Sequence, residues 1–430
     1  MSTVCVHGLG YIGLPTATIM ANYDHEVYGY DAAPEVRSRL RDGDIHLDEP
    51  GLRAFVTQAL ESDQLEITDD VVPAKYHVIC VPTPFEPETK TADLSYVEAA
   101  GRAIVDQLRH GDTVILESTV PPGTTEEALR PILEESGLSA GDDFALVHCP
   151  ETVLPGNIIA ELRENNRIIG GVNGVSTESA VRLYATFVEG EIRTVPNPTM
   201  AEFVKLIQNT FRDANIALAN EIAKLAADYG LDSRVGIELA NSHPRVDILQ
   251  PGPGVGGHCL PIDPWFLGQR SSELDLIAKA REVNDGMSGY VIELLREELG
   301  ELAGQRIAVL GVAYKGNVGD VRMSPGLKLA HELQHGDRPR EMTAADGGTS
   351  TPPEIRLHDP NVDDPTLELT DLETATTDAN AAVVTTDHDA FEAFDPGAFR
   401  ERMADPIVVD TKAILEPSEW RREGFTVRRI

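Results

Sequence analysis

Cysteine is scarce in this chain, with four residues in 430 and no Cys-x-x-Cys pair. Four scattered thiols do not make a disulfide framework, and the sequence shows no Cys/His group at metal-ligand spacing. We therefore expect reduced cysteines and no bound metal. Cys5, Cys80 and Cys149 lie in apolar, strand-like runs, where sulfur usually behaves as a small hydrophobe. Only Cys259 lies in a glycine-rich loop.

Long hydrophobic runs are also missing from the chain. No segment reaches the roughly 18 uninterrupted apolar residues that a membrane span needs. Met1 leads directly into a strand-like run, without the basic and apolar regions of a secretory signal. We therefore expect a soluble, cytoplasmic protein.

Positive charge is in short supply, with 36 basic against 71 acidic residues and a formal net charge of −35. Such a field opposes binding to nucleic acid and to anionic membranes. Lysine is scarcer than arginine, and the acidic residues are spread along the whole chain. This surface is typical of a halophilic protein. At 1 M salt the Debye length falls to about 3 Å, so the repulsion between the acidic residues is screened. An acidic protein from a low-salt organism is the alternative.

The first part of the chain predicts a parallel α/β domain over residues 1–198. Short β-branched runs alternate there with amphipathic stretches, which is the pattern of βαβ units. The expected strands are Val4–His7, Val27–Tyr30, Val78–Val81, Thr113–Glu117, Phe144–His148 and Arg167–Gly170.

The middle and the end of the chain predict two further domains. Residues 199–241 follow one helical pattern, so 199–300 is expected to be a helical domain with a dimerisation surface. Residues 301–430 begin a second α/β series, with the strands Arg306–Gly311, Ile355–Leu357, Ala382–Thr385 and Ile407–Asp410. Gly336–Glu354 has no periodicity and is expected to be a surface insertion. The predicted fold is α/β, with two Rossmann-like doubly wound domains joined by a long central helix.

A dinucleotide fingerprint follows the first strand. Gly8, Gly10 and Gly13, with Tyr11 and Ile12 between the last two, open a helical pattern. The glycines permit a tight turn and bring backbone N–H groups close to a pyrophosphate at a helix N-terminus. Asp31 ends the next strand, 18 residues after Gly13. Its carboxylate suits the adenosine ribose and repels a 2′-phosphate, so the predicted cofactor is NAD.

Two more strand ends are expected at the cofactor, because ligands of open α/β sheets lie at the carboxyl ends of the strands. The residues concerned are Pro82, Thr83, Ser118 and Thr119. Thr124 and Glu127 have the spacing of a capping box, which predicts a helix start there. An ordinary proline-rich loop is the alternative for each strand end.

Lys205 and Asn209 lie four residues apart in the long helical pattern and share one face of it. A lysine and an amide on one face can polarise a substrate oxygen. Taken alone, however, the same pair also suits a solvated helix face.

In this combination the chain resembles the UDP-glucose/GDP-mannose dehydrogenase family, which oxidises the C6 alcohol of a sugar nucleotide to a carboxylate with two NAD. The resemblance covers nearly the whole chain and rests on Gly8–Gly13, Val81–Thr83, Ser118–Gly123, Cys149–Glu151, Glu202–Asn209, Gly254–Asp263 and Ala313–Arg322. Cys149–Asn157 and Gly254–Trp265 look closest to its UDP-N-acetyl-D-mannosamine dehydrogenases.

The resemblance implies a role for each matching residue. Cys259 would be the nucleophile that forms a thiohemiacetal and then a thioester, with Lys205 and Asn209 stabilising the oxyanion. Asp263 would order a proton-shuttling water, Glu151 would be the general base for thioester hydrolysis, and Thr119 would support the catalytic water. Arg322 would reach the cofactor. The substrate would contact Glu151, Leu154, Lys205, Asn209, Arg245, Gly256 and Lys315.

Three alternatives stay open. The same machinery could oxidise UDP-glucose or another UDP-hexose, since the sequence does not give the shape of the pocket at C2 of the sugar. A non-catalytic nucleotide-sugar-binding protein would not need Cys259, Lys205, Asn209 and Asp263. A two-electron β-hydroxyacid dehydrogenase would need neither Cys259 nor a second nucleotide-binding domain. The expected partners are a UDP-sugar and a second copy of the chain.

Overall fold

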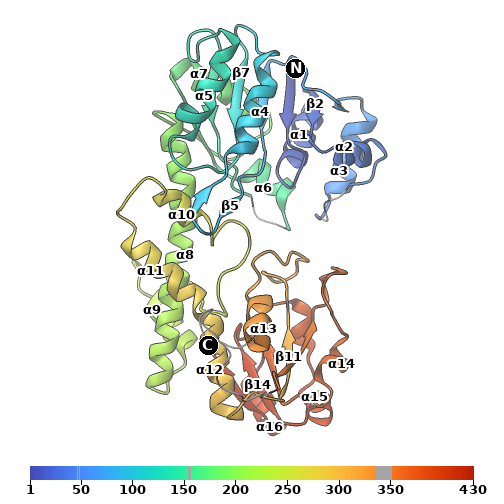
Figure 1. The fold of residues 1–430 in the computed structure, drawn as a ribbon, viewed down its shortest axis with the longest axis vertical. Helices are drawn as coiled ribbons and strands as arrows, with labels where there is room; N and C mark the ends of the chain where they lie inside the picture. Colours follow the sequence, from blue (N-terminus) through green and yellow to red (C-terminus); the bar gives the residue numbers. More distant parts are fainter. Residues whose placement is uncertain (46, 48, 154–155, 336–350) are drawn as a thin grey trace, which may run out of the picture. The chain divides into compact units, whose positions relative to one another are not determined.

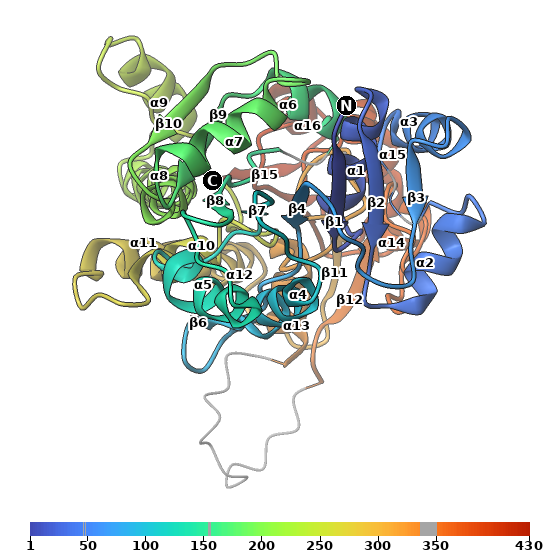
Figure 2. The same ribbon diagram turned by 90° about the horizontal axis from the view of Figure 1, so that it is seen from above.

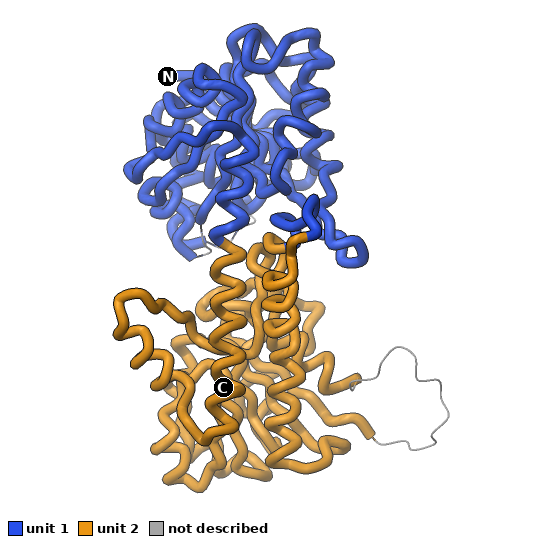
Figure 3. Tube along the Cα trace, turned by 90° about the vertical axis from the view of Figure 1, so that its left-hand side faces the viewer, with its two compact units in different colours: residues 1–208, 265–272 blue, residues 209–264, 273–430 orange. Residues whose placement is uncertain are grey.

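The computed structural model describes residues 1–45, 47, 49–153, 156–335 and 351–430, and they form two compact units (Figure 3). Unit 1 comprises Met1–Gln208 and Trp265–Ser272, and unit 2 comprises Asn209–Pro264 and Glu273–Ile430. The boundary falls inside two helices, α8 (Pro198–Asp228) and α10 (Asp263–Gly268). The division into 1–198, 199–300 and 301–430 stays a prediction.

Unit 1 is built on an eight-stranded sheet in the order β10-β9-β8-β7-β4-β1-β2-β3 (Figure 1). Figure 2 shows β1, β2 and β3 side by side at one end of this sheet. The strands are β1 (Thr3–His7), β2 (Glu26–Tyr30), β3 (Leu65–Ile67), β4 (Tyr76–Ile79), β7 (Thr113–Leu116), β8 (Ala145–His148), β9 (Arg167–Gly171) and β10 (Ile192–Val195).

The prediction of a wholly parallel sheet is wrong at one pair, because β8 and β9 run antiparallel. β9 and β10 pair in parallel with each other and so run opposite to the other six strands. Residue periodicity identifies a strand but carries no information about its direction, which the connection decides. The short strands β3 and β10 were not predicted.

Helices cover both faces of this sheet. Alternate strand residues point to opposite faces, so Val4 and Val6 enter one core while Val114 and Leu116 enter the other. The first core is closed by α1 (Gly13–Asn22), α3 (Leu52–Glu61), α6 (Ile158–Glu164) and α7 (Gly174–Tyr184). The second is closed by α4 (Ser95–Val105), a π-helical turn at Thr125–Leu129 and α5 (Arg130–Leu133). α2 (Pro34–Arg41), a 3₁₀ turn at Glu134–Ser136 and the hairpin β5 (Phe85–Glu86) with β6 (Thr91–Ala92) complete the unit.

Unit 2 contains a five-stranded parallel sheet in the order β12-β11-β13-β14-β15. Its strands are β11 (Arg306–Leu310), β12 (Glu354–His358), β13 (Ala381–Val384), β14 (Ile407–Asp410) and β15 (Thr426–Arg429). α12 (Met287–Leu299) and α13 (Pro325–His335) pack on one face. The other face carries α14 (Leu372–Thr376), a 3₁₀ turn at Asp389–Ala393, α15 (Pro396–Arg402) and α16 (Pro417–Arg422), and α9 (Ser233–Asn241) and α11 (Asp275–Asp285) precede the sheet.

The helix predicted over 199–241 is two helices. Gly230 adopts a left-handed conformation with φ of 66°, so the helix cannot continue beyond α8. The Asp232 side chain then accepts hydrogen bonds from the N–H groups of Arg234 and Val235 and starts α9. The predicted insertion Gly336–Glu354 lies outside the described residues over 336–350, and its last residue opens β12.

Buried histidines make the stability of unit 1 sensitive to acid. His7, His77 and His148 lie in its sheet and are at most 1% exposed. Burial lowers the pKa of His148 to about 3, and burial followed by the charge of Arg109 lowers that of His77 to about 4. Between these values and about 6.5, the unfolded chain binds protons that the folded chain cannot bind. The free energy of unfolding should therefore fall as the pH drops below about 6.5.

Replacing His148 by leucine should stabilise the protein. Neither ring nitrogen of His148 has a hydrogen-bond partner among the described residues, so the substitution removes two unpaired buried polar atoms. We expect a gain of about 1–3 kcal/mol near pH 7 and a larger gain at pH 5. Unfolding midpoints in molar salt at the two pH values measure it. His110→Gln, at an exposed histidine, is the control and should leave the acid sensitivity unchanged. If His148→Leu is as sensitive to acid as the wild type, burial of His148 is not a cause of that sensitivity.

Candidate functional site

The glycine turn after β1 leaves room for a ligand on one side only. A Cβ on Gly8 would lie 2.7 Å from the Cys80 carbonyl oxygen, and one on Gly13 would lie 1.8 Å from the Gly8 oxygen. Nothing lies within 4 Å of the corresponding position on Gly10. The first and third glycines are therefore required by the backbone packing, while the second leaves open space. Such a turn at the start of α1 fits a pyrophosphate.

The Asp31 carboxylate lies beside this turn. It accepts hydrogen bonds from the Leu9 N–H at 2.8 Å and the Ala33 N–H at 2.9 Å. A carboxylate offers about four acceptor positions, so two remain for ribose hydroxyls. Of the two residues between Gly10 and Gly13, Ile12 packs on the core, and the Tyr11 hydroxyl donates to Glu49.

The two other strand ends predicted at the cofactor are hydrogen-bonded to each other. The Thr83 hydroxyl donates to the Thr119 carbonyl oxygen at 2.7 Å, and the Ser118 hydroxyl donates to the Val81 carbonyl oxygen at 2.7 Å. Both hydroxyl protons are thus used within the protein. Pro82, between the two contacts, is exposed. The structure brings the loops after β4 and β7 together as the sheet topology requires.

The capping box predicted at Thr124 and Glu127 does not form, although a helical segment begins at Thr125. The Thr124 hydroxyl donates to the Pro121 carbonyl oxygen, and the Glu127 side chain pairs with Arg270. The cap is the Glu202 carboxylate from α8, which sequence spacing could not reveal because it is distant in the chain.

Glu151 and Lys205 interact electrostatically in unit 1. Both side chains are 8% exposed. Burial raises the pKa of Glu151 to about 7, although the charges of Lys205 and Arg167 oppose that rise. One Glu151 oxygen accepts the Val153 N–H. A carboxyl group with a pKa near neutrality can exchange protons in the physiological range. Leu154, predicted to contact substrate, lies outside the described residues.

The sequence analysis missed two buried charged residues, Arg167 and Glu117, whose charges act on Glu151. Arg167 is fully buried, and its Nε and Nη1 atoms have no hydrogen-bond partner among the described residues. Glu117 is 2% exposed and accepts from the Cys80 thiol at 3.1 Å and from the Tyr184 hydroxyl. An arginine opening an otherwise apolar strand was the available signal for Arg167.

The cysteine loop of unit 2 is held by backbone contacts. Cys259 is exposed, whereas Cys5, Cys80 and Cys149 are buried as predicted. The Cys259 carbonyl oxygen accepts from the N–H groups of Ile262 at 3.0 Å and Asp263 at 2.9 Å.

Glycines fit this loop against the segment that follows β11. Gly257 has φ of 82° and donates its N–H to the Arg322 carbonyl oxygen at 3.0 Å. A Cβ on Gly256 would lie 2.7 Å from the Met323 oxygen, and one on Gly257 would lie 2.9 Å from the Tyr314 ring. The loop therefore requires glycine at both positions.

Asn209 and Asp263 form a buried polar pair in unit 2. The Asn209 side-chain amide donates to an Asp263 carboxylate oxygen at 2.6 Å, and the residues are 7% and 3% exposed. Asp263 begins α10, four residues after Cys259. The carboxylate is thereby oriented by an amide from α8.

The three predicted basic residues of unit 2 are exposed. Arg322 forms an ion pair with Asp320 at 2.6 Å, and its hydrogen bonds to that carboxylate raise the pKa of the guanidinium. Lys315 lies in the loop after β11, and Arg245 follows α9. Their contacts with substrate or cofactor stay predictions.

One group of potential metal ligands was not anticipated. In the described part of the chain, Cys5, His7 and His77 offer ligand atoms within 4.8 Å of one another. The two imidazoles already form a hydrogen bond of 3.2 Å to each other, and burial raises the pKa of the Cys5 thiol to about 11. The expectation of no metal stays a prediction.

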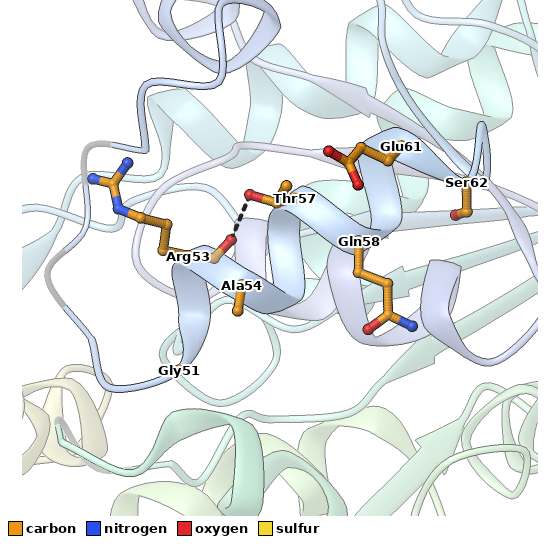
Figure 4. Close-up of a pocket in the computed structure, with 7 residues that line it drawn as sticks. All are labelled: Gly51, Arg53, Ala54, Thr57, Gln58, Glu61 and Ser62. Atoms are coloured by element: carbon orange, nitrogen blue, oxygen red, sulfur yellow. Dashed lines mark hydrogen bonds between the residues drawn. The ribbon is translucent and has the colours of Figure 1, made fainter.

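A pocket lies along α3 in unit 1 (Figure 4). It is lined by Gly51, Arg53, Ala54, Thr57, Gln58, Glu61 and Ser62. A single helix and its ends supply all of them, and no strand end contributes.

No helix in the described part of the chain is long and apolar enough to cross a membrane.

Models of one family match three consecutive parts of the chain. They describe the NAD-binding domain of the UDP-glucose/GDP-mannose dehydrogenase family at residues 2–188, its central domain at 199–286 and its UDP-binding domain at 308–417.

Full-length relatives show the same similarity. A UDP-N-acetyl-D-mannosamine dehydrogenase of Methanococcus maripaludis is 40% identical over 99% of this chain and 96% of its own length. An NDP-N-acetyl-D-galactosaminuronic acid dehydrogenase of Ralstonia nicotianae is 40% identical over 96% of both chains. The solved structure of a Pyrococcus horikoshii UDP-D-ManNAc dehydrogenase matches with a TM-score of 0.90 and 40% identity, covering 100% of this chain and 99% of that one.

Proposed function

Because the chain belongs to the UDP-glucose/GDP-mannose dehydrogenase family, we propose that it oxidises UDP-N-acetyl-D-mannosamine to UDP-N-acetyl-D-mannosaminuronate. The family makes it an NAD-dependent nucleotide-sugar dehydrogenase. The observation that carries the choice of sugar is the 40% identity, over nearly the full length of both chains, to a UDP-N-acetyl-D-mannosamine dehydrogenase.

The residues at the glycine turn suit NAD. Gly8, Gly10 and Gly13 provide the close backbone approach, and Asp31 keeps acceptor positions for the ribose. Bound NAD supplies the hydride acceptor for each of the two oxidations. Thr83 and Ser118 keep the neighbouring strand ends in contact.

Cys259 is the nucleophile in this proposal. The first oxidation removes a hydride and a proton from the C6 alcohol and leaves an aldehyde. The Cys259 sulfur adds to the aldehyde carbon to give a thiohemiacetal, and loss of a second hydride and proton gives a thioester. Water then displaces the thiol and leaves the carboxylate. Exposure of Cys259, unlike the other three cysteines, supports this role.

The other polar residues serve the charges and protons of these steps. Lys205 and Asn209 stabilise the oxygen that becomes negative when sulfur or water adds. Glu151 removes a proton from the hydrolytic water, and its pKa of about 7 supports that task. Thr119 supports that water, and Asp263, held by Asn209, orders the water that shuttles protons.

The substrate contacts stay proposals as well. Gly256, Lys315 and Arg245 are assigned to the nucleotide sugar, and Arg322 to the cofactor. A different N-acetylated hexose is a second candidate, because the Ralstonia nicotianae relative, which has a different sugar in its name, is also 40% identical. UDP-glucose is the third.

A homodimer through α8 and α9 is part of the proposal. Apolar side chains are exposed at helical spacing along α8, and further ones continue on α9; they are Phe203, Ile207, Phe211, Leu218, Leu225, Val235 and Leu239. Exposed apolar surface of this extent is typical of an interface between subunits. The net charge of −35 supports a halophilic enzyme. A cytoplasmic location and a role in polysaccharide biosynthesis, which the uronate product suits, are further parts of the proposal.

The deciding experiment measures NADH formed per sugar nucleotide consumed, in molar salt. UDP-N-acetylmannosamine, UDP-N-acetylgalactosamine and UDP-glucose are supplied in parallel. We expect two NADH per molecule of the first sugar and little from the others. The same yield from another sugar alone would move the assignment to that sugar. One NADH per sugar would refute the two-step oxidation.

A further inference from the structure

Glu202 is a buried carboxylate that lies between two parts of the proposed site. It is 1% exposed and lies on α8, three residues before Lys205. Burial raises the pKa of this carboxyl group, although its hydrogen bonds oppose the rise. Glu202 and Lys205 both belong to unit 1, so their relative position does not depend on the placement of unit 2.

Three hydrogen bonds join Glu202 to the loop after β7. One carboxylate oxygen accepts the Gly123 N–H at 2.5 Å. The other accepts the Thr125 N–H at 2.8 Å and the Thr125 hydroxyl at 2.6 Å. The carboxylate therefore caps the helical segment that starts at Thr125 and fixes the end of the loop that carries Ser118 and Thr119.

No local residue takes over this cap. The Thr124 hydroxyl is used by Pro121, and Glu127 pairs with Arg270 at the surface. Without Glu202, two backbone N–H groups would be left unpaired in a buried position, at a substantial free-energy cost. The loop would have to move to pair them with other acceptors.

The other end of the loop is hydrogen-bonded to the strand end after β4, which is assigned to the cofactor site. Thr83 donates to the Thr119 carbonyl oxygen, and Ser118 donates to the Val81 carbonyl oxygen. A shift of the loop is thus transmitted to the strand ends at the glycine turn. A shift of α8 at Glu202 would also move Lys205, one turn further along the helix, whose charge acts on Glu151.

We propose that Glu202 is a positioning residue that holds the Ser118–Thr119 loop and the Lys205 turn of α8 in one fixed arrangement. Resting on the proposed function, this predicts that Glu202 touches neither substrate nor cofactor, and that its loss impairs both NADH binding and turnover. Small misplacements of groups around a reacting centre cost large factors in rate.

The test compares Glu202→Gln and Glu202→Ala with the wild-type protein in molar salt. Glutamine keeps one acceptor oxygen for Thr125 but presents an NH₂ group to the Gly123 N–H. We expect Glu202→Gln to lower kcat about tenfold and to weaken NADH binding about threefold, and Glu202→Ala to lose more of both. NADH fluorescence on binding gives the Kd without any sugar substrate. Glu127→Gln, which breaks an exposed ion pair in the helical segment that follows this loop, should stay within twofold of wild type.

A purely structural role would give a different result. Activity and NADH binding would then fall only in proportion to the unfolded fraction, and both would return at a temperature well below the unfolding midpoint. That outcome, or unchanged kcat and Kd in Glu202→Gln, overturns the proposal. If wild-type protein forms no NADH with any sugar tested, the proposed function fails, while the NADH-binding comparison still decides the role of Glu202.

Discussion

Cys259→Ala should abolish the complete oxidation, with a loss of about 10³-fold or more in the rate of carboxylate formation. Without the thiol, the aldehyde carbon has no nucleophile to hold it for the second oxidation. The expected cost far exceeds that of removing a hydrogen bond. NADH formation and uronate formation are measured in the same reaction, by absorbance and by chromatography of the sugar nucleotide.

The neighbouring residue provides the control for this variant. His258 is exposed beside Cys259, and adjacent side chains seldom point at each other, so we assign it no role in the reaction. His258→Ala should keep the wild-type stoichiometry and a rate within a few-fold. NADH titration should show normal cofactor affinity in both variants. Two NADH per sugar at the wild-type rate from Cys259→Ala would rule out the thioester route.

Lys205→Met should lower kcat by about 10²-fold to 10³-fold, because a charge facing the developing oxyanion is lost. The same substitution should change the pH dependence. In the wild type, the pKa of Glu151 is about 7 and the general base must be deprotonated, so the rate should rise with pH through neutrality. Lys205 lowers that pKa, so its removal should move the rising limb to higher pH.

Lys224→Met is the matched control for Lys205→Met. Lys224 also lies on α8, where its ammonium group packs over the Tyr290 ring. Its loss should change neither kcat nor the pH profile. Glu151→Gln should flatten the rising limb. If the limb stays at the same pH in both Lys205→Met and Glu151→Gln, another group governs the hydrolysis.

The sequence by itself determined the elements that depend on local patterns. The fingerprint Gly8–Gly13 between a strand and a helix predicted the first Rossmann-like domain, and alternating apolar runs placed most strands within a residue or two. The glycines before Cys259 predicted that this cysteine lies in a loop, and it is exposed there. These features depend on neighbouring residues only, so they can be seen in the chain.

Tertiary structure alone decided the features that join distant segments. The antiparallel placement of β9 depends on how its connection returns to the sheet. The cap at Thr125 comes from Glu202, 77 positions along the chain, and displaced the local capping box. The charges of Arg167, Glu117 and Lys205 act on Glu151 only after folding, and burial there raises the pKa of Glu151. Periodicity encodes which face of an element is buried, but the charges that gather there depend on packing.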